Sequence, residues 1–124
     1  MNFEKFDAIL QEKKNYGQIK NADVVVEYQN DACGDDYVLS LKLKNGVVEE
    51  AKYTTNGCSF SILSLEILCD LLKDKPIDQL EDYITKDKFE EVVEGYPPRR
   101  INYIDTALEV MKQAQRLAKE KGAA

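Results

Sequence analysis

The chain has 124 residues, with 17 lysines and arginines, 23 aspartates and glutamates and no histidine, so its formal net charge is −6. The negative charge argues against nucleic acid and anionic membranes as partners, because both bind clustered positive charge. The lack of histidine excludes histidine-ligated metal sites and nucleophile–histidine pairs built from this chain alone. At this length we expect one domain, residues 1–124, whose core needs no disulfide.

The first residues predict a helix over residues 2–13, because apolar side chains recur there at helical spacing. The Asn15-Tyr16-Gly17 turn ends it. This start is charged and amphipathic, unlike a signal peptide, and no stretch approaches the roughly 20 apolar residues that cross a bilayer. We therefore expect a cytoplasmic protein with reduced thiols and no membrane contact.

Three strands are predicted next. The valine-rich segment 23–28 indicates the first, and the alternation of apolar and polar residues over 37–43 indicates the second. Asn45-Gly46 is the strongest short signal for a hairpin turn, and residues 47–54 form the return strand. These strands make an antiparallel meander.

Helical patterns follow the third strand. Apolar residues at helical spacing mark a helix that runs toward Pro76, with Ser59 and Ser61 as ordinary residues of its first turn. Shorter helical pieces are predicted over residues 80–84 and 89–93.

The last helix is predicted to be long, because an apolar stripe extends from Ile104 to Ala118. A Gly95-Tyr96-Pro97-Pro98 segment breaks the chain before it. The fold class is therefore α+β: a three-stranded antiparallel sheet with helices packed on one face and a long C-terminal helix.

Two of the three cysteines fall in turn-forming segments. Cys33 lies between the first two strands, and Cys58 lies where the third strand meets the following helix. In a meander these positions share one end of the sheet, so the two thiols could converge there, and Asp35 could add a carboxylate. Gly34 and Gly57 would let the backbone approach closely or adopt a positive φ. The helix N-terminus would favour the thiolate of Cys58.

Simpler interpretations of the cysteines stay open. Cysteines in loops of intracellular proteins are often inert, and the neighbouring glycines are ordinary turn residues. Cys69 is predicted to be a core thiol, because it lies about 16 Å along the helix axis from Cys58, too far to share an ion.

Four segments together resemble the IscU/NifU N-terminal type of iron–sulfur cluster assembly scaffold, a family that includes the SufU branch. They are Asn15-x-Gly17, Asn30-Asp31-Ala32-Cys33-Gly34-Asp35, Gly57-Cys58 and Tyr96-Pro97-Pro98-Arg99-Arg100-Ile101. The resemblance extends over nearly the whole chain, and the short spacing before Pro97-Pro98 favours the IscU-like side.

The resemblance implies an activity and partners. Such a scaffold accepts sulfur from a cysteine desulfurase, assembles a cluster on three cysteines and an aspartate, and passes it to apo iron–sulfur proteins. The Tyr96 to Ile101 segment resembles the one by which some members engage an Hsp70-type chaperone, although a simple helix breaker explains it too. Arg100 would balance an anionic cluster, or be a surface cation.

One departure from the family pattern affects the ligand set. The positions of the third ligand cysteine and its preceding histidine read Asn102 and Tyr103 here. A phenol with a pKa near 10 is a poor cluster ligand, and Tyr103 is expected to fill the former ligand space with its ring. Only Cys33, Asp35 and Cys58 therefore carry over as ligands for a metal or cofactor.

Several functions fit this incomplete set. A [2Fe–2S] cluster or iron could be held with ligands from a homodimer or from a partner protein, which makes the chain a scaffold or carrier and not an enzyme. A zinc ion could instead sit on two thiolates, a carboxylate and water in a sulfur-relay protein. A metal-free adaptor of a cysteine desulfurase is the remaining alternative.

Overall fold

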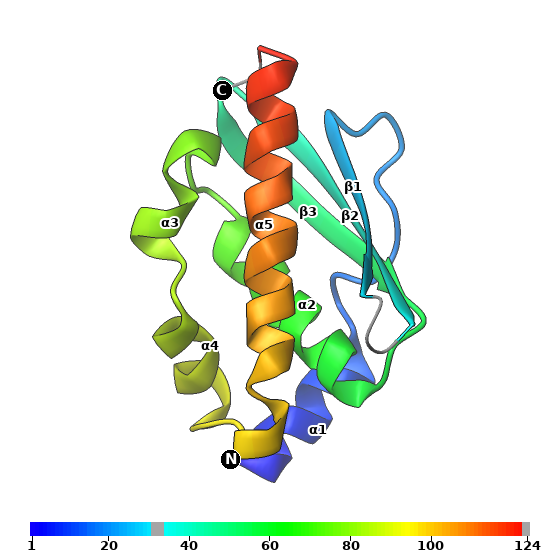
Figure 1. Cartoon of the computed structure of the whole chain (residues 1–124), viewed down its shortest axis with the longest axis vertical. Helices are drawn as coiled ribbons and strands as arrows, with labels where there is room; N and C mark the ends of the chain where they lie inside the picture. The colour runs from blue at the N-terminus through cyan, green and yellow to red at the C-terminus, as the bar shows by residue number, and fades with distance from the viewer. Residues whose placement is uncertain (31–33, 123–124) are drawn as a thin grey trace.

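The sheet and helices follow the order that the sequence predicts. The computed structural model describes residues 1–30 and 34–122. Within them the chain forms three strands and five α-helices (Figure 1). Their bounds are α1, Phe3–Glu12; β1, Val24–Asn30; β2, Asp35–Lys44; β3, Val47–Thr55; α2, Ser59–Leu72; α3, Leu80–Tyr83; α4, Lys86–Val93; and α5, Asn102–Glu120. Short 3-10 turns precede α3 and α5, at Ile77–Gln79 and Pro98–Arg100.

The sheet is the predicted antiparallel meander, with strand order β1-β2-β3. Asn30 pairs with Asp35 at one end, and Lys44 pairs with Val47 at the other. The second pair encloses Asn45 and Gly46, whose φ angles of 54° and 76° suit the tight hairpin that this dipeptide favours. The meander places the start of β2 beside the end of β3.

Helices cover one face of the sheet, as expected for this fold class (Figure 1). The α2 helix packs on β3, α5 packs on β1, and the two helices contact each other. Apolar side chains fill the space between these layers, and Leu39, Leu63 and Val110 are fully buried. On the opposite face, the backbone N–H of Ile19 donates a hydrogen bond of 3.2 Å to Ser40 Oγ. The chain after α1 first pairs with β3 at Tyr16 and then reaches that face at Ile19.

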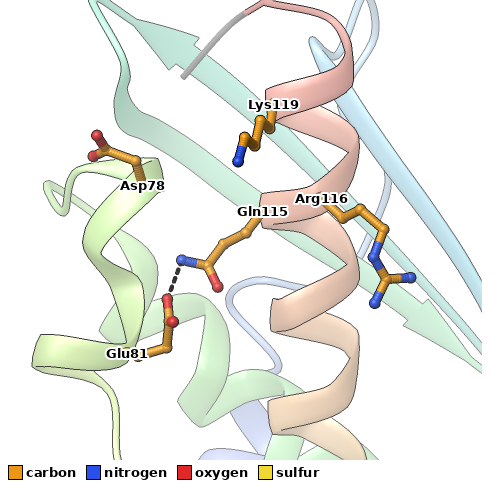
Figure 2. A pocket seen from close by; sticks show the side chains of 5 residues that line it. All are labelled: Asp78, Glu81, Gln115, Arg116 and Lys119. Atoms are coloured by element: carbon orange, nitrogen blue, oxygen red, sulfur yellow. Dashed lines mark hydrogen bonds between the residues drawn. The ribbon is translucent and has the colours of Figure 1, made fainter.

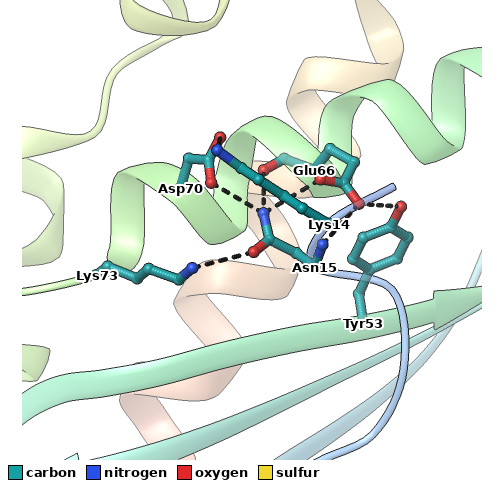
Figure 3. A network of polar contacts seen from close by, with 6 residues as sticks. All are labelled: Lys14, Asn15, Tyr53, Glu66, Asp70 and Lys73. Atoms are coloured by element: carbon teal, nitrogen blue, oxygen red, sulfur yellow. Dashed lines mark hydrogen bonds and ion pairs between the residues drawn. The ribbon is translucent and has the colours of Figure 1, made fainter. Parts of the chain in front are cut away.

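A buried polar network fixes the turn after α1 to helix α2 (Figure 3). The backbone N–H of Asn15 donates to the Glu66 carboxylate at 3.1 Å, and its side-chain amide donates to the same group at 3.2 Å. The Tyr53 hydroxyl donates a third hydrogen bond at 2.7 Å. Asn15 and Glu66 are each only 2% exposed, so these donors replace the water that the carboxylate would otherwise bind.

The same network extends to charged residues nearer the surface. The Asn15 amide also donates to Asp70 at 2.9 Å and accepts from Lys73 at 3.1 Å, while Lys14 forms an ion pair with Asp70 at 3.3 Å. Sequence analysis did not identify Glu66 as a buried charge, because its position within an apolar run resembles that of an ordinary helical residue. Asn15, in the turn after α1, is thus held to α2 by its hydrogen bonds to Glu66 and Asp70.

We predict that Glu66→Gln changes how stability depends on pH. Burial raises the pKa of Glu66, although hydrogen bonds from Tyr53 and Asn15 oppose the shift. A raised folded-state pKa stabilises the protein below the unfolded-state value of about 4.5, and this contribution is lost as pH rises through the folded-state pKa. The advantage of the natural chain over Glu66→Gln should therefore shrink from pH 4.5 toward neutrality.

Urea unfolding of both chains across that range measures the difference in free energy of unfolding. Glu49→Gln, at an exposed position, is the matched control and should give a difference that barely depends on pH. A pH-independent difference for Glu66→Gln would contradict the assignment.

Candidate functional site

The site lies at the end of the sheet where β2 begins and β3 leads into α2. Asp35 is the first residue of β2, and Cys58 is the N-cap residue of α2. Pairing of Tyr37 with Thr55 holds these two chain segments side by side. The structure therefore brings Asp35 and Cys58 to the same end of the sheet, whereas Cys33 lies outside the described residues.

Hydrogen bonds around Asn56 close this end of the sheet. The backbone N–H of Asp36 donates to Asn56 Oδ1 at 2.8 Å, and the Thr55 hydroxyl donates to the carbonyl of Asp36 at 2.7 Å. The Gly57 N–H then donates to Thr55 Oγ1 at 3.1 Å. The turn before Cys58 is thus tied to the strand that carries Asp35.

Ser61 connects the predicted site residues through its side chain. Its Oγ lies 3.3 Å from Asp35 Oδ2, to which it donates, 3.0 Å from the Tyr37 hydroxyl and 3.9 Å from Cys58 Sγ. Tyr37 also donates to the same carboxylate oxygen at 3.4 Å. Ser61 is 1% exposed and Tyr37 is 2% exposed, so both hydroxyls hold Asp35 from inside the core.

Sequence analysis missed this role of Ser61 and Tyr37. The interpretation of Ser61 as an ordinary first-turn residue is wrong, because its hydroxyl is buried and bonded to Asp35. Two spacings could have signalled it: Tyr37 is two residues after Asp35 and so shares its side of the strand, and Ser61 is one helical turn after Gly57.

The two predicted glycines act in different ways. A Cβ atom on Gly57 would overlap Ser61 Oγ and lie 2.9 Å from Asp35 Oδ2, so only glycine allows this close approach. Gly34 has a φ of +71° and open space around its Cα, so it serves the backbone conformation before β2.

The Cys58 thiol is exposed, and its pKa is lower than that of an ordinary cysteine. Partial burial raises its pKa, but a hydrogen bond from the Tyr103 side chain and others from Ser61 and the Phe60 backbone more than offset this, so the net pKa is lowered. These backbone donors belong to the first turn of α2, which agrees with the predicted influence of the helix N-terminus. An accessible thiolate can bind a metal or attack sulfur.

Aromatic side chains border the thiol. Tyr103, in the first turn of α5, is half-buried and lies with its ring centroid 6.0 Å from that of Phe60. The guanidinium of Arg100 lies 5.4 Å from the Phe60 ring centroid, and Arg100 is exposed. Tyr103 is therefore one of the groups that lower the pKa of Cys58, and Arg100 places a positive charge over Phe60 in the first turn of α2.

Other candidate features lie outside this arrangement. Cys69 is fully buried, as predicted, and burial raises its pKa. A hollow of about 580 Å³ lies between α5 and the segment around α3 (Figure 2). Its lining residues are Asp78, Glu81, Gln115, Arg116 and Lys119, and Gln115 donates a hydrogen bond to Glu81. None of them contributes to the end of the sheet that holds Cys58.

Within residues 1–30 and 34–122, no three side chains among histidine, cysteine, aspartate and glutamate are grouped closely enough to hold a metal ion. Asp35 and Cys58 are the members of the predicted ligand set that these residues include. The same part of the chain contains no helix that is long and apolar enough to span a membrane.

The α+β fold, with a thiol and a carboxylate at the junction of sheet and helix, is that of a known class of proteins. The chain belongs to the NifU-like N-terminal domain family, whose model matches residues 4–123. This confirms the family that the sequence motifs indicate.

Named relatives fall into two groups. The chain is 32% identical over 119 residues to the iron–sulfur cluster assembly scaffold protein IscU of Aquifex aeolicus. The aligned region covers 92% of this chain and 75% of that protein. It is 37% identical over 60 residues to the zinc-dependent sulfurtransferase SufU of Bacillus subtilis. That aligned region covers 48% of this chain and 41% of that protein.

A crystal structure supports the fold. FiSufU from Fervidobacterium islandicum AW-1 superposes with a TM-score of 0.74, covering 90% of this chain and 94% of that one, at 19% identity. Similarity at that level of identity shows a shared fold.

We predict that Gly57→Ala lowers the free energy of unfolding by about 1–3 kcal/mol, because the added methyl group overlaps buried atoms. Ser61→Gly in the same chain should recover part of the loss, since it removes two of the three closest atoms. Urea unfolding of the natural chain, both single variants and the double variant measures this coupling. Equal cost of Gly57→Ala in both backgrounds would show that the close approach is not formed.

Proposed function

We propose that this chain is an iron–sulfur cluster assembly scaffold that holds iron or a cluster as cargo on Cys33, Asp35 and Cys58. The observation that carries the proposal is the position of Ser61 Oγ, which contacts both the Asp35 carboxylate and the Cys58 thiol. These two groups are distant in sequence and chemically suited to iron. Family membership and the scaffold relatives support the same function.

The proposed ligands fit iron but do not complete a cluster. A [2Fe–2S] centre typically uses four cysteine thiolates, and the proposed ligand set contains two, Cys33 and Cys58. We propose that a second copy of the chain or a cysteine of a partner protein supplies the remaining ligands. Iron or a cluster whose ligands come from two proteins can exchange those ligands, which suits a protein that passes its cargo on.

Sulfur would reach the site from a cysteine desulfurase, and recipients would be apo iron–sulfur proteins. An Hsp70-type chaperone is a further proposed partner through the Tyr96 to Ile101 segment. Within it Tyr96 is buried and hydrogen-bonded to Ser64 at 3.0 Å, whereas Pro98, Arg99 and Arg100 are exposed. Recognition would therefore use the three exposed residues.

We predict that anaerobic reconstitution of the full chain with iron and sulfide produces visible cluster absorption. Cys33→Ser and Cys58→Ser should abolish it, because each removes a thiolate ligand. Cys69→Ala is the matched control: Cys69 is fully buried, so the absorption should persist. Absorption that survives Cys58→Ser but is lost in Cys69→Ala would overturn the site. Native mass measurement of the loaded chain distinguishes one copy from two.

A sulfur-relay function is the second candidate, because Cys58 is both exposed and shifted toward its thiolate. In that reaction the Cys58 thiolate attacks the outer sulfur of a desulfurase persulfide. A new S–S bond forms on Cys58, and the desulfurase cysteine leaves as a thiolate. The partial similarity to the Bacillus subtilis sulfurtransferase supports this candidate.

Mass spectrometry separates the two functions. Incubation with a cysteine desulfurase and cysteine should add the mass of one sulfur atom to Cys58 if relay occurs, with or without bound metal. Formation of a cluster without any persulfide supports the scaffold alone. Neither product, together with desulfurase binding that survives Cys58→Ser, would identify an adaptor.

We predict that Tyr103→Cys increases retention of iron after gel filtration, because it adds a third thiol where the resembled family carries its third ligand cysteine. Metal analysis of the natural chain and the variant, loaded under identical conditions, measures the gain. Tyr83→Cys, at an exposed position on α3, is the control for nonspecific binding by an added thiol. Equal retention in all three chains would count against an intact site.

A further inference from the structure

The chain contains two Asn-Gly pairs, Asn45-Gly46 in the hairpin turn and Asn56-Gly57 beside the site. Asparagine followed by glycine is especially prone to spontaneous deamidation, because glycine has no side chain to keep its backbone nitrogen away from the asparagine amide. Conversion of Asn56 would alter the turn that holds Cys58 at the end of the sheet. The two pairs have different surroundings in the structure.

Deamidation at Asn56 would change the backbone as well as the side chain. The Gly57 nitrogen loses its proton and bonds to Cγ of Asn56, and the side-chain nitrogen leaves as ammonia with that proton. Water then opens the resulting succinimide ring at either carbonyl group, which gives aspartate or isoaspartate. Isoaspartate adds a carbon atom to the backbone just before Gly57, where even a Cβ atom has no room.

The Gly57 nitrogen is held by Thr55. Its N–H donates to Thr55 Oγ1 at 3.1 Å, and the Thr55 hydroxyl donates to the carbonyl of Asp36 at 2.7 Å. The hydroxyl is thus fixed to β2, and the Gly57 N–H points at Thr55. Attack on the Asn56 amide requires this hydrogen bond to break, because the nitrogen must lose its proton and approach Cγ in a new direction.

Two effects on Asn56 itself oppose each other. Its Oδ1 accepts a hydrogen bond of 2.8 Å from the backbone N–H of Asp36, which draws electrons from Cγ and by itself favours attack. Ring closure must also rotate the peptide group between Asn56 and Gly57. Tight packing of Gly57 against Ser61 and Asp35 opposes that rotation. Protection of Asn56 therefore depends on keeping the Gly57 nitrogen in place.

Asn45 lacks these restraints. It is exposed at the tip of the hairpin, and its side chain makes no hydrogen bond within residues 1–30 and 34–122. Its amide can therefore rotate toward the nitrogen of Gly46. The hairpin pair gives a reference rate of deamidation within the same molecule.

We propose that Asn56 is a latent deamidation site and that Thr55 protects it, by keeping the Gly57 nitrogen hydrogen-bonded and away from the asparagine amide. In the folded chain Asn45 then reacts first. Loss of the Thr55 hydroxyl would leave a polarised amide beside a nucleophile that has lost its hydrogen-bond acceptor. The inference concerns the chain without cargo, so it does not depend on the proposed function.

Prolonged incubation of the folded full chain in warm, mildly alkaline buffer, followed by digestion and mass spectrometry, measures conversion at both positions. In the natural chain Asn45 should convert while Asn56 stays largely unchanged. Thr55→Val has nearly the same shape without the hydroxyl, and it should raise the rate at Asn56 about 10-fold, as expected for loss of one hydrogen bond. Thr55→Ser keeps the hydroxyl and should keep the slow rate.

Thr54→Val is the matched control, because the Thr54 side chain makes no hydrogen bond within the part of the chain that the structure describes. It should leave the rate at Asn56 unchanged, and the rate at Asn45 should be the same in all four chains. An Asn56 rate that equals the Asn45 rate in the natural chain, or that does not rise in Thr55→Val, would overturn the inference.

Unfolding tests the protection without any substitution. In guanidinium chloride the hydrogen bond and the packing are both lost, so Asn56 of the natural chain should convert about as fast as Asn45. The same ratio of the two rates in folded and unfolded chains would refute protection by the fold. Slow hydrogen exchange of the Gly57 amide in the folded chain would support the bond to Thr55, and rapid exchange would refute it.

Discussion

The close approach of Gly57 to Ser61 and Asp35 is the constraint on which the site depends. The absence of a Cβ atom lets the chain pass from β3 into α2 directly over the start of β2. Ser61 can then bond to Asp35 while Cys58 remains at the helix N-terminus. A wider turn would separate the thiol from the carboxylate, even if every strand and helix were unchanged.

The architecture could be predicted from local patterns in the sequence. Alternation over β2 and the Asn45-Gly46 turn specify the hairpin, and the register that follows brings Asp35 and Cys58 together. These patterns work because burial of one sheet face selects the strand register. The position of Cys33 stays a prediction, because it lies outside the described residues.

The side-chain contacts of the site could not be predicted in the same way. Ser61 resembles any serine in a first helical turn, and only the three-dimensional proximity of Tyr37 and Asp35 gives its hydroxyl a function. Glu66 resembles a surface glutamate until the distant Asn15 and Tyr53 surround its carboxylate. Tyr103 was expected to fill space with its ring, and its side chain also lowers the pKa of Cys58. Each of these roles depends on residues far apart in the sequence.

The two sides of the site differ in how firmly the rest of the fold holds them. Tyr103 belongs to the first turn of that helix, which follows a 3-10 turn and has Ile101 as an N-cap residue without a side-chain hydrogen bond. Asp35, by contrast, is anchored by strand pairing and two buried hydroxyls. Unwinding this first helical turn would therefore move Tyr103 and leave the sheet intact, since helix ends open at a lower free energy than a buried core. The α5 side of the site can thus unfold locally while the β2 side stays rigid. A partner protein could therefore reach the site from the α5 side without displacing the Asp35 carboxylate.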